Sequence, residues 1–422
     1  MQVSLPYGRT TITESIDVGA MDFATPKQWR VKPEHEVIHV LREPIGPTLP
    51  QLARHSRNAV ILTCDKTRGL PSHMTIPLIL EELAKGDLST NNTVILVATG
   101  LHRDETMSDV KERVGPNIAE DIEVRIHDSD EESELVHLGQ LPSGTPLSLN
   151  RLVVESDLVI LESTVEPHFF AGFTGGSKVI LPGVAGTETV LQNHSWDKID
   201  DPKSRYGVLD NPVRADANEA LRFLKRVFSL NLVLDEKKRL IRANSGEPIK
   251  SFNQMANAVD DHARVRIRHR PDLVITTNGG YPLDRNLYQC VKGIAVPENV
   301  LHSGSRIVMV SECSDGVAHD GFCNIMIRDQ PDRLYELLKH SDSASRDQWE
   351  AQVLCRILRK NPVWFVTRQE LKHDVEAMHM HYAATVREAL ESAGVRQGES
   401  VLVVPQGPST ILTLNEEKDA HA

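Results

Sequence analysis

The stretch AVILTCDKTR at residues 59–68 is an apolar, β-branched run that ends in a charged turn. Its composition predicts a buried strand, after which Ser72 is expected to cap a helix that reaches about Glu82. The stretch TVILVATGLH at residues 93–102 has the same organisation, and LVIL at residues 158–161 predicts a third strand. Strands that alternate with helices in this way predict an α/β fold with mainly parallel sheets.

A second series of strands is predicted after residue 270. Short apolar runs indicate strands at 272–276, 306–310, 363–366 and 400–404. A chain of 422 residues exceeds the size at which one hydrophobic core usually keeps growing, so two domains are expected. We place the boundary so that the α/β domains cover residues 1–265 and 266–422. The active site is expected in the cleft between them.

Composition limits the partners of the chain. A formal net charge of -12 argues against nucleic acid or an anionic membrane as the main partner. The densest basic run, residues 264–270, alternates with apolar residues and indicates a strand edge or a linker. Five widely spaced cysteines indicate reduced thiols, and no apolar run approaches membrane-spanning length. We therefore expect a soluble cytoplasmic protein.

The segment EPHFFAGFTGGSK at residues 166–178 combines glycines with a lysine and a histidine. It does not fit the phosphate loop GxxxxGK[ST], because Ser177 precedes the lysine and Val179 follows it. The glycines can still bring a phosphate or a cofactor close to the backbone, and Lys178 can pair with an anion or act as a nucleophile. The structural alternative is a tight turn with a solvated lysine.

Several polar residues follow predicted strands, where open parallel sheets bind ligands. His102 and His168 suit general acid and base roles, although many of the 18 histidines must have no catalytic role. Arg68 can hold a carboxylate in bidentate fashion or form a structural ion pair with Asp65. Together these residues predict one shared cleft.

Two further groups leave structural and functional interpretations open. Tyr288, Gln289 and Lys292 lie within little more than one turn of a predicted helix, where they can line a site or form a solvated face. His194, next to Trp196, can be a metal ligand or a packed, hydrogen-bonded residue.

Five motifs occur together in a fixed order. They are Asp65-x-Thr67-Arg68, Thr99-Gly100-x-His102, Glu166-Pro167-His168 with Gly175-Gly176-x-Lys178, Asn193-His194, and Asn278-Gly279-Gly280-Tyr281-Pro282 through Tyr288-Gln289-x-x-Lys292. In this combination the chain resembles the nickel-pincer lactate racemase family over about residues 65–292. One departure is Gly69, which stands where the family often has proline.

The resemblance implies a cofactor and a set of site residues. The cofactor would be the nickel-pincer nucleotide, a pyridinium-3-thioamide-5-thiocarboxylic acid mononucleotide that carries nickel. Residues 1–265 would bind it, and residues 266–422 would complete the substrate pocket. The implied roles are catalysis by His102 and His168, a covalent link at Lys178, nickel ligation by His194, cofactor contacts from Asp65, Gly175, Gly176 and Tyr288, and substrate contacts from Arg68, Gln289, Lys292 and Trp349.

The resemblance also implies an activity, inversion of the α-carbon of a 2-hydroxy acid by reversible hydride transfer with two opposed histidine bases. The implied partners are a small-molecule 2-hydroxy acid, lactate or a related one, and the enzymes that synthesise the cofactor. Two other hypotheses stay open at this point, a zinc-dependent hydrolase and a non-catalytic protein that binds carboxylates or nucleotides.

Overall fold

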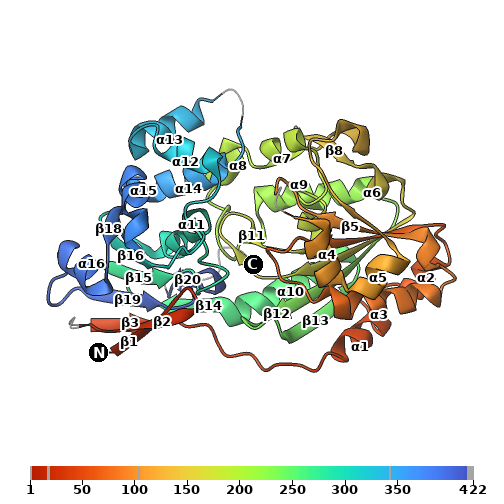
Figure 1. Cartoon of the computed structure of the whole chain (residues 1–422), viewed down its shortest axis with the longest axis horizontal. Helices are drawn as coiled ribbons and strands as arrows, with labels where there is room; N and C mark the ends of the chain where they lie inside the picture. Colours follow the sequence, from red (N-terminus) through yellow and green to blue (C-terminus); the bar gives the residue numbers. More distant parts are fainter. Residues whose placement is uncertain (1, 17–19, 103–104, 342–343, 416–422) are drawn as a thin grey trace.

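The computed structural model describes residues 2–16, 20–102, 105–341 and 344–415 of the chain. Its main elements are two six-stranded sheets flanked by helices, which form two lobes side by side (Figure 1). All neighbouring strands within these two sheets are parallel except one antiparallel pair at an edge. The predicted α/β class with mainly parallel sheets is therefore confirmed.

The first sheet has the strand order β13-β12-β9-β4-β5-β6. Its strands in that order are β13 (Leu240–Gly246), β12 (Val227–Leu234), β9 (Leu158–Thr164), β4 (Ala59–Cys64), β5 (Thr93–Ala98) and β6 (Glu123–Ile126). The three runs that decided the fold class from sequence are the adjacent strands β9, β4 and β5. Helices cover both faces of these central strands, which explains their nearly continuous apolar sequence.

The second sheet has the strand order β18-β17-β16-β15-β19-β3. Its strands in that order are β18 (His381–Ala383), β17 (Val363–Val366), β16 (Arg306–Val310), β15 (Leu273–Thr277), β19 (Ser400–Val404) and β3 (Ala20–Phe23). The four strands predicted after residue 270 are β15, β16, β17 and β19.

The N-terminal segment departs from the expected division at residues 265 and 266. Strand β3 pairs in parallel with β19 in the second sheet, and the hairpin of β1 (Gln2–Tyr7) and β2 (Thr10–Ser15) lies beside the same lobe (Figure 1). The assignment of the whole of 1–265 to the first domain is therefore wrong for these strands. The physical reason is that β3 satisfies the backbone hydrogen-bonding groups at the edge of β19.

Helices connect the strands and cover the sheets. In chain order the α-helices are α1 (Glu36–Arg42), α2 (Leu49–Ala53), α3 (Ser72–Ala84), α4 (Met107–Val114), α5 (Pro116–Asp121), α6 (Arg151–Glu155), α7 (Thr187–Asn193), α8 (Trp196–Asp200), α9 (Pro212–Ala220), α10 (Pro248–Ala263), α11 (Leu287–Ala295), α12 (Asp320–Met326), α13 (Pro331–Lys339), α14 (Gln348–Leu358), α15 (Lys372–Ala377) and α16 (Val386–Ser392). Shorter pairs are β7 (Leu135–Gln140) with β8 (Pro146–Asn150), β10 (Pro167–His168) with β11 (Gly172–Phe173), and β14 (Arg264–Ile267) with β20 (Ile411–Leu414).

Ser72 does not cap the helix that follows β4, although the helix lies where the sequence predicted it. Ser72 is the first residue of α3, and the capping position belongs to Pro71. Its hydroxyl instead donates to the buried carboxylate of Glu162 on β9, at 2.9 Å. The need to satisfy a buried carboxylate explains why this hydroxyl points towards the sheet.

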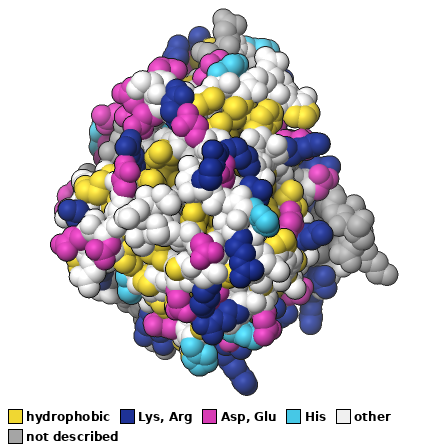
Figure 2. All heavy atoms as spheres, turned by 90° about the vertical axis from the view of Figure 1, so that its right-hand side faces the viewer, with side chains coloured by type: hydrophobic (Ala, Val, Ile, Leu, Met, Phe, Trp, Pro, Cys, Tyr) yellow, Lys and Arg dark blue, Asp and Glu magenta, His cyan; other side chains and the backbone are white. Residues whose placement is uncertain are grey.

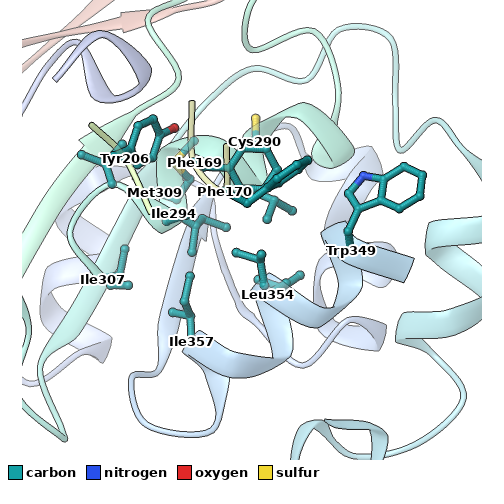
Figure 3. Close-up of a cluster of buried hydrophobic side chains, with 14 of the residues drawn as sticks. Phe169, Phe170, Tyr206, Cys290, Ile294, Ile307, Met309, Trp349, Leu354 and Ile357 are labelled. Carbon is teal, nitrogen blue, oxygen red and sulfur yellow. The ribbon is translucent and has the colours of Figure 1, made fainter. Parts of the chain in front are cut away.

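One hydrophobic cluster joins the two lobes. Figure 3 shows Phe169, Phe170 and Tyr206 of the first domain among side chains of the second, including Ile294 and Leu354, and all five are buried. The two domains therefore share a packed hydrophobic core.

The surface and the thiols agree with the composition of the chain. On the face in Figure 2, Lys and Arg side chains lie interspersed with Asp and Glu. All five cysteines are free thiols. Within the described ranges, no helix has the length and apolar character that crossing a membrane requires.

Candidate active site

The predicted residues of the first domain lie beyond the carboxyl ends of three neighbouring strands. Asp65 and Arg68 follow β4, His102 follows β5, and His168 lies in the β10–β11 hairpin that follows β9. Because these strands are adjacent and parallel, their carboxyl ends meet at the same edge of the sheet. The fold thus produces the shared edge that the sequence predicted.

Asp65 and His102 form a hydrogen-bonded pair. The Nδ1 atom of His102 lies 2.5 Å from Oδ2 of Asp65, whose other oxygen accepts hydrogen bonds from the amide and hydroxyl of Thr67. Burial opposes the charge of Asp65, but His102 and Thr67 hold the pKa of this carboxyl at about 2. Burial also opposes the charge of His102, and Asp65 overrides it by raising the pKa of the imidazole. The carboxylate thus fixes Nδ1 as the protonated nitrogen and leaves Nε2 for chemistry.

The backbone N–H and carbonyl groups of Arg68 form hydrogen bonds. Its guanidinium has no hydrogen bond or ion pair to any other described residue. The Arg68 amide donates to the Asp65 carbonyl at 3.2 Å, and the Arg68 carbonyl accepts from the Lys238 ammonium, also at 3.2 Å. Gly69 has φ +59, a conformation closed to proline. Gly69 therefore adopts a left-handed backbone conformation, and the turn after Arg68 differs from one that contains proline at this position.

His168 has a different environment from that of His102. It is 8 % exposed, and its Nδ1 accepts the backbone N–H groups of Phe170 at 3.4 Å and Ala171 at 3.2 Å. A neutral ring in this arrangement carries its proton on Nε2. Burial lowers the pKa of His168 well below its usual value, and the positive charge of Lys178 lowers it further.

The glycines before Lys178 are required by close packing. Gly175 has φ +75, and a Cβ atom there would lie 2.5 Å from the Thr164 carbonyl oxygen. Gly176 has φ +58, and its Cβ would lie 2.6 Å from the ring of Phe252. These contacts press the loop, which we call the glycine loop (residues 172–178), against β9 and α10 and set the direction in which Lys178 leaves it.

Lys178 presents a partly buried amine without an acidic partner. No hydrogen bond or ion pair reaches its Nζ from the described residues, and its nearest ring contact is Phe170, 5.2 Å from the ring centroid. Burial lowers the pKa of Lys178 well below its usual value, with further repulsion from Arg214. A buried amine whose pKa is lowered is available as a nucleophile more readily than the solvated lysine of the structural alternative.

Phe170 contacts three of the predicted residues. Its ring centroid lies 4.5 Å from that of His168 and 5.1 Å from that of His194, in addition to the contact with Lys178. The sequence interpretation did not select Phe170, although it stands within the quoted segment. A paired aromatic gives no chemical signal by itself, and only the fold reveals what it contacts.

His194 ends α7 at the cleft. It is 4 % exposed, and its Nδ1 is buried without a hydrogen-bond partner among the described residues. On its other side, the Trp349 ring of the second domain lies 5.0 Å away, edge to face. An unpartnered ring nitrogen in a buried site fits a metal ligand better than the satisfied histidine that the sequence left open.

The second domain contributes α11 to the opposite wall. Lys292 Nζ donates to Gln289 Oε1 at 2.5 Å, and the Lys292 carbonyl accepts from the hydroxyl of Tyr206 at 3.0 Å. Burial, together with repulsion from Arg68 across the cleft, lowers the pKa of Lys292 to about 8. Tyr288 is 6 % exposed and stacks on His319, so the solvated-face interpretation of this helix is wrong.

Glu350 is a buried carboxyl that sequence reasoning missed. It follows Trp349 in the first turn of α14, is 1 % exposed, and has one oxygen without a partner among the described residues. Burial raises its pKa to about 8, and Lys292 opposes that increase. A glutamate in a helical first turn is common in sequences, so only its burial singles it out.

The predicted residues therefore come together from both domains. Asp65, Arg68, His102, His168, Lys178 and His194 come from the first domain, and Tyr288, Gln289, Lys292 and Trp349 come from the second. The donor set fits the implied cofactor, because the site offers a buried amine with a lowered pKa and an unpartnered imidazole nitrogen. Among the described residues, no group of three or more His, Cys, Asp or Glu side chains is arranged to hold a metal ion without such a cofactor.

Fold and site together define a two-domain α/β protein in which histidines, lysines and an arginine from both domains lie close together. Comparison with known families identifies a lactate racemase N-terminal domain over residues 7–207 and a lactate racemase C-terminal domain over residues 267–412. The chain therefore belongs to the lactate racemase family, and it is an isomerase.

Individual relatives agree with this assignment. The chain is 37% identical to the lactate racemases of Thermoanaerobacterium thermosaccharolyticum and Lactiplantibacillus plantarum, over 97% of its length and 99% of theirs. The apoprotein structure of the former superposes with a TM-score of 0.92 at 34% identity, covering 98% of this chain and all of that one. A Thermotoga maritima protein shares the fold alone, with a TM-score of 0.65 at 20% identity. Family membership disfavours the zinc-hydrolase and non-catalytic hypotheses.

Proposed function

We propose that the chain racemises a 2-hydroxy acid, lactate or a close analogue, with the nickel-pincer nucleotide as its cofactor. The observation that carries this proposal is the meeting of His168, Lys178 and His194 around Phe170. The imidazole of His168 suits proton transfer, whereas the buried amine of Lys178 and the unpartnered ring nitrogen of His194 suit the attachment of a metal-bearing group. Relatives over nearly the whole length carry the name lactate racemase.

Arg68 and Lys292 would bind the substrate carboxylate. They come from opposite domains, and neither has an acidic side chain in hydrogen-bonding contact among the described residues. Two unneutralised cations that repel each other across a cleft favour an anion between them. Gln289 holds the Lys292 ammonium in place, and Trp349 closes the pocket beside His194.

His102 and His168 would move the hydroxyl proton. With Nδ1 bonded to Asp65, the Nε2 atom of His102 would accept the hydroxyl proton of one enantiomer, and in the opposite direction of reaction it would donate a proton to the 2-oxo oxygen. His168 would serve the opposite face of the planar 2-oxo acid. To accept a proton on Nε2, its ring must first move the proton to Nδ1 and give up two backbone hydrogen bonds.

Lys178 would form the covalent link to the cofactor, and His194 would bind its nickel. Asp65, Tyr288 and the two glycines would line it. When bound, the cofactor supplies the acceptor and donor of the α-hydrogen as hydride, since a carbon next to an ionised carboxylate is too weak an acid for imidazole alone. Maturation then requires cofactor-synthesis enzymes as partners, and the cytoplasm is the proposed location.

Protein produced together with the cofactor-synthesis enzymes tests the proposal. We expect near-stoichiometric nickel, a mass increase that Lys178→Ala abolishes, and racemisation of D- and L-lactate measured by chiral chromatography. In heavy water, hydride transfer predicts little deuterium at the α-carbon. Zinc without an adduct, or rapid deuterium uptake at that carbon, would contradict the proposal. The exposed Lys372→Ala is the matched control and should retain nickel, adduct and activity.

A further inference from the structure

Helix α9 contacts both segments that carry the proposed cofactor-binding residues. It lies beside the glycine loop and beside the end of α7, where His194 is located. None of its residues belongs to the motifs that suggested the function. Two of its polar residues, Arg214 and Asp216, are nevertheless buried, which is unusual for charged side chains.

Three polar residues of the α9 region form hydrogen bonds with the segment that leads to Lys178, residues 170–177. Asn211, which caps the helix, donates to the Phe170 carbonyl at 2.8 Å. Arg214 donates to the Phe173 carbonyl and, at 3.3 Å, to the Gly175 carbonyl. Asn218 Oδ1 accepts from the hydroxyl of Ser177, one residue before the lysine, at 2.7 Å. The spacing of these residues, i, i+3 and i+7, places them on one helical face.

Arg214 is the central residue of this face. It is 1 % exposed, its guanidinium lies 4.0 Å over the Phe252 ring, and it has no acidic partner among the described residues. A buried guanidinium without a carboxylate is costly, so its carbonyl and ring contacts must hold it firmly. Its two carbonyl contacts lie on the glycine loop that carries Lys178.

Helix α9 also forms hydrogen bonds with Asn193, the residue before His194. Asn193 Nδ2 donates to the Val213 carbonyl at 3.0 Å and to Asp216 Oδ2 at 3.2 Å. The same Asp216 carboxylate is paired with Lys198 and accepts from the hydroxyl of Thr145 at 2.9 Å. Asn193 is fully buried and directly precedes His194. These hydrogen bonds therefore fix the position of the backbone from which the His194 side chain extends.

We propose that α9 sets the spacing between Lys178 and His194, with Arg214 as a positioning residue for the lysine and Asn193 as a positioning residue for the histidine. A group that is attached covalently at one residue and bound through its metal at the other needs a fixed distance between them. A single rigid helix bonded to both segments provides that distance before the group arrives. This inference rests on the proposed function.

The two attachments should fail separately. Arg214→Met removes both carbonyl contacts at similar size, and we expect the fraction of protein with the Lys178 adduct to fall roughly tenfold, as for loss of a charge-assisted hydrogen bond. Asn193→Ala leaves the glycine loop intact, so the adduct should persist while nickel content after exposure to a chelator falls several-fold. Intact mass and metal analysis measure the two outcomes, with the outward-facing Glu219→Gln as control.

Hydrogen exchange of the cofactor-free protein separates this inference from the proposed function. In Arg214→Met, amides of residues 172–180 should exchange roughly tenfold faster, and in Asn193→Ala the faster exchange should be confined to α7. If Arg214→Met does not fold, Asn218→Ala tests the same loop with a smaller expected change. Parent-like exchange and adduct in the Arg214 and Asn218 variants would overturn the inference. Absence of nickel and adduct in the parent would instead overturn the proposed function.

Discussion

His102 and His168 face the same cleft but are held in opposite ways. A carboxylate holds Nδ1 of His102, whereas two backbone amides hold Nδ1 of His168. The first arrangement raises the pKa of its imidazole, and burial lowers that of the second. The site is therefore not symmetrical, although racemisation requires both directions of reaction.

In the proposed mechanism, this difference distinguishes the two histidines. The Asp65 carboxylate stabilises a positive charge on His102, so His102 would be able to hold the proton of the substrate hydroxyl. Burial disfavours a charge on His168, so substrate or cofactor would have to change its surroundings before it did the same. The protein alone therefore favours a protonated imidazole at His102 and disfavours one at His168.

The largest expected effect comes from removing either histidine. His102→Asn and His168→Asn should each reduce the rate of lactate racemisation by about 10²- to 10⁴-fold, because both directions need a proton acceptor and a proton donor. Initial rates from each enantiomer, measured by chiral chromatography, check this result. The exposed His55→Asn should retain the parent rate. A parent-like rate in either cleft variant would remove that histidine from the mechanism.

An intermediate effect is expected when the carboxylate of the pair is removed. Asp65→Asn should reduce the rate about 10- to 100-fold, the range for loss of a hydrogen bond to a charged group. Because Asp65 raises the pKa of His102, His102 should titrate at a lower pH in the variant than in the parent. Imidazole resonances of the cofactor-free protein report this midpoint. An unchanged midpoint would show that the carboxylate does not control the histidine.

The smallest effect on His102 is expected from changing Thr67, which bonds Asp65 rather than the imidazole itself. Thr67→Val removes the hydroxyl that Asp65 accepts at 2.5 Å and keeps the shape of the side chain. The pKa of Asp65 should rise, but the carboxylate stays ionised where the imidazole titrates, so the His102 midpoint should move much less than in Asp65→Asn. Thr11→Val, on an exposed strand, is the control. A shift as large as that of Asp65→Asn would contradict this order.

Much of the fold and part of the site follow from local sequence. The runs that became β4, β5 and β9 are apolar because both faces of these strands are covered, and a periodic signal of this kind does not depend on the rest of the chain. The motif residues follow those strands directly, so their shared edge was predictable. The place of β3 was not, because strand pairing between residues nearly 400 apart leaves no local signal.

The sequence by itself determined the α/β class, the family resemblance and the residue types at the cleft, since each depends on neighbouring residues along the chain. Only the tertiary structure decided that Ser72 binds Glu162, that Phe170 lies among three of the site residues, and that Arg214 and Glu350 are buried. It also decided how the two histidines differ. The pKa of an imidazole depends on the burial and the partners of its ring, and these come from distant segments that meet only in the folded chain.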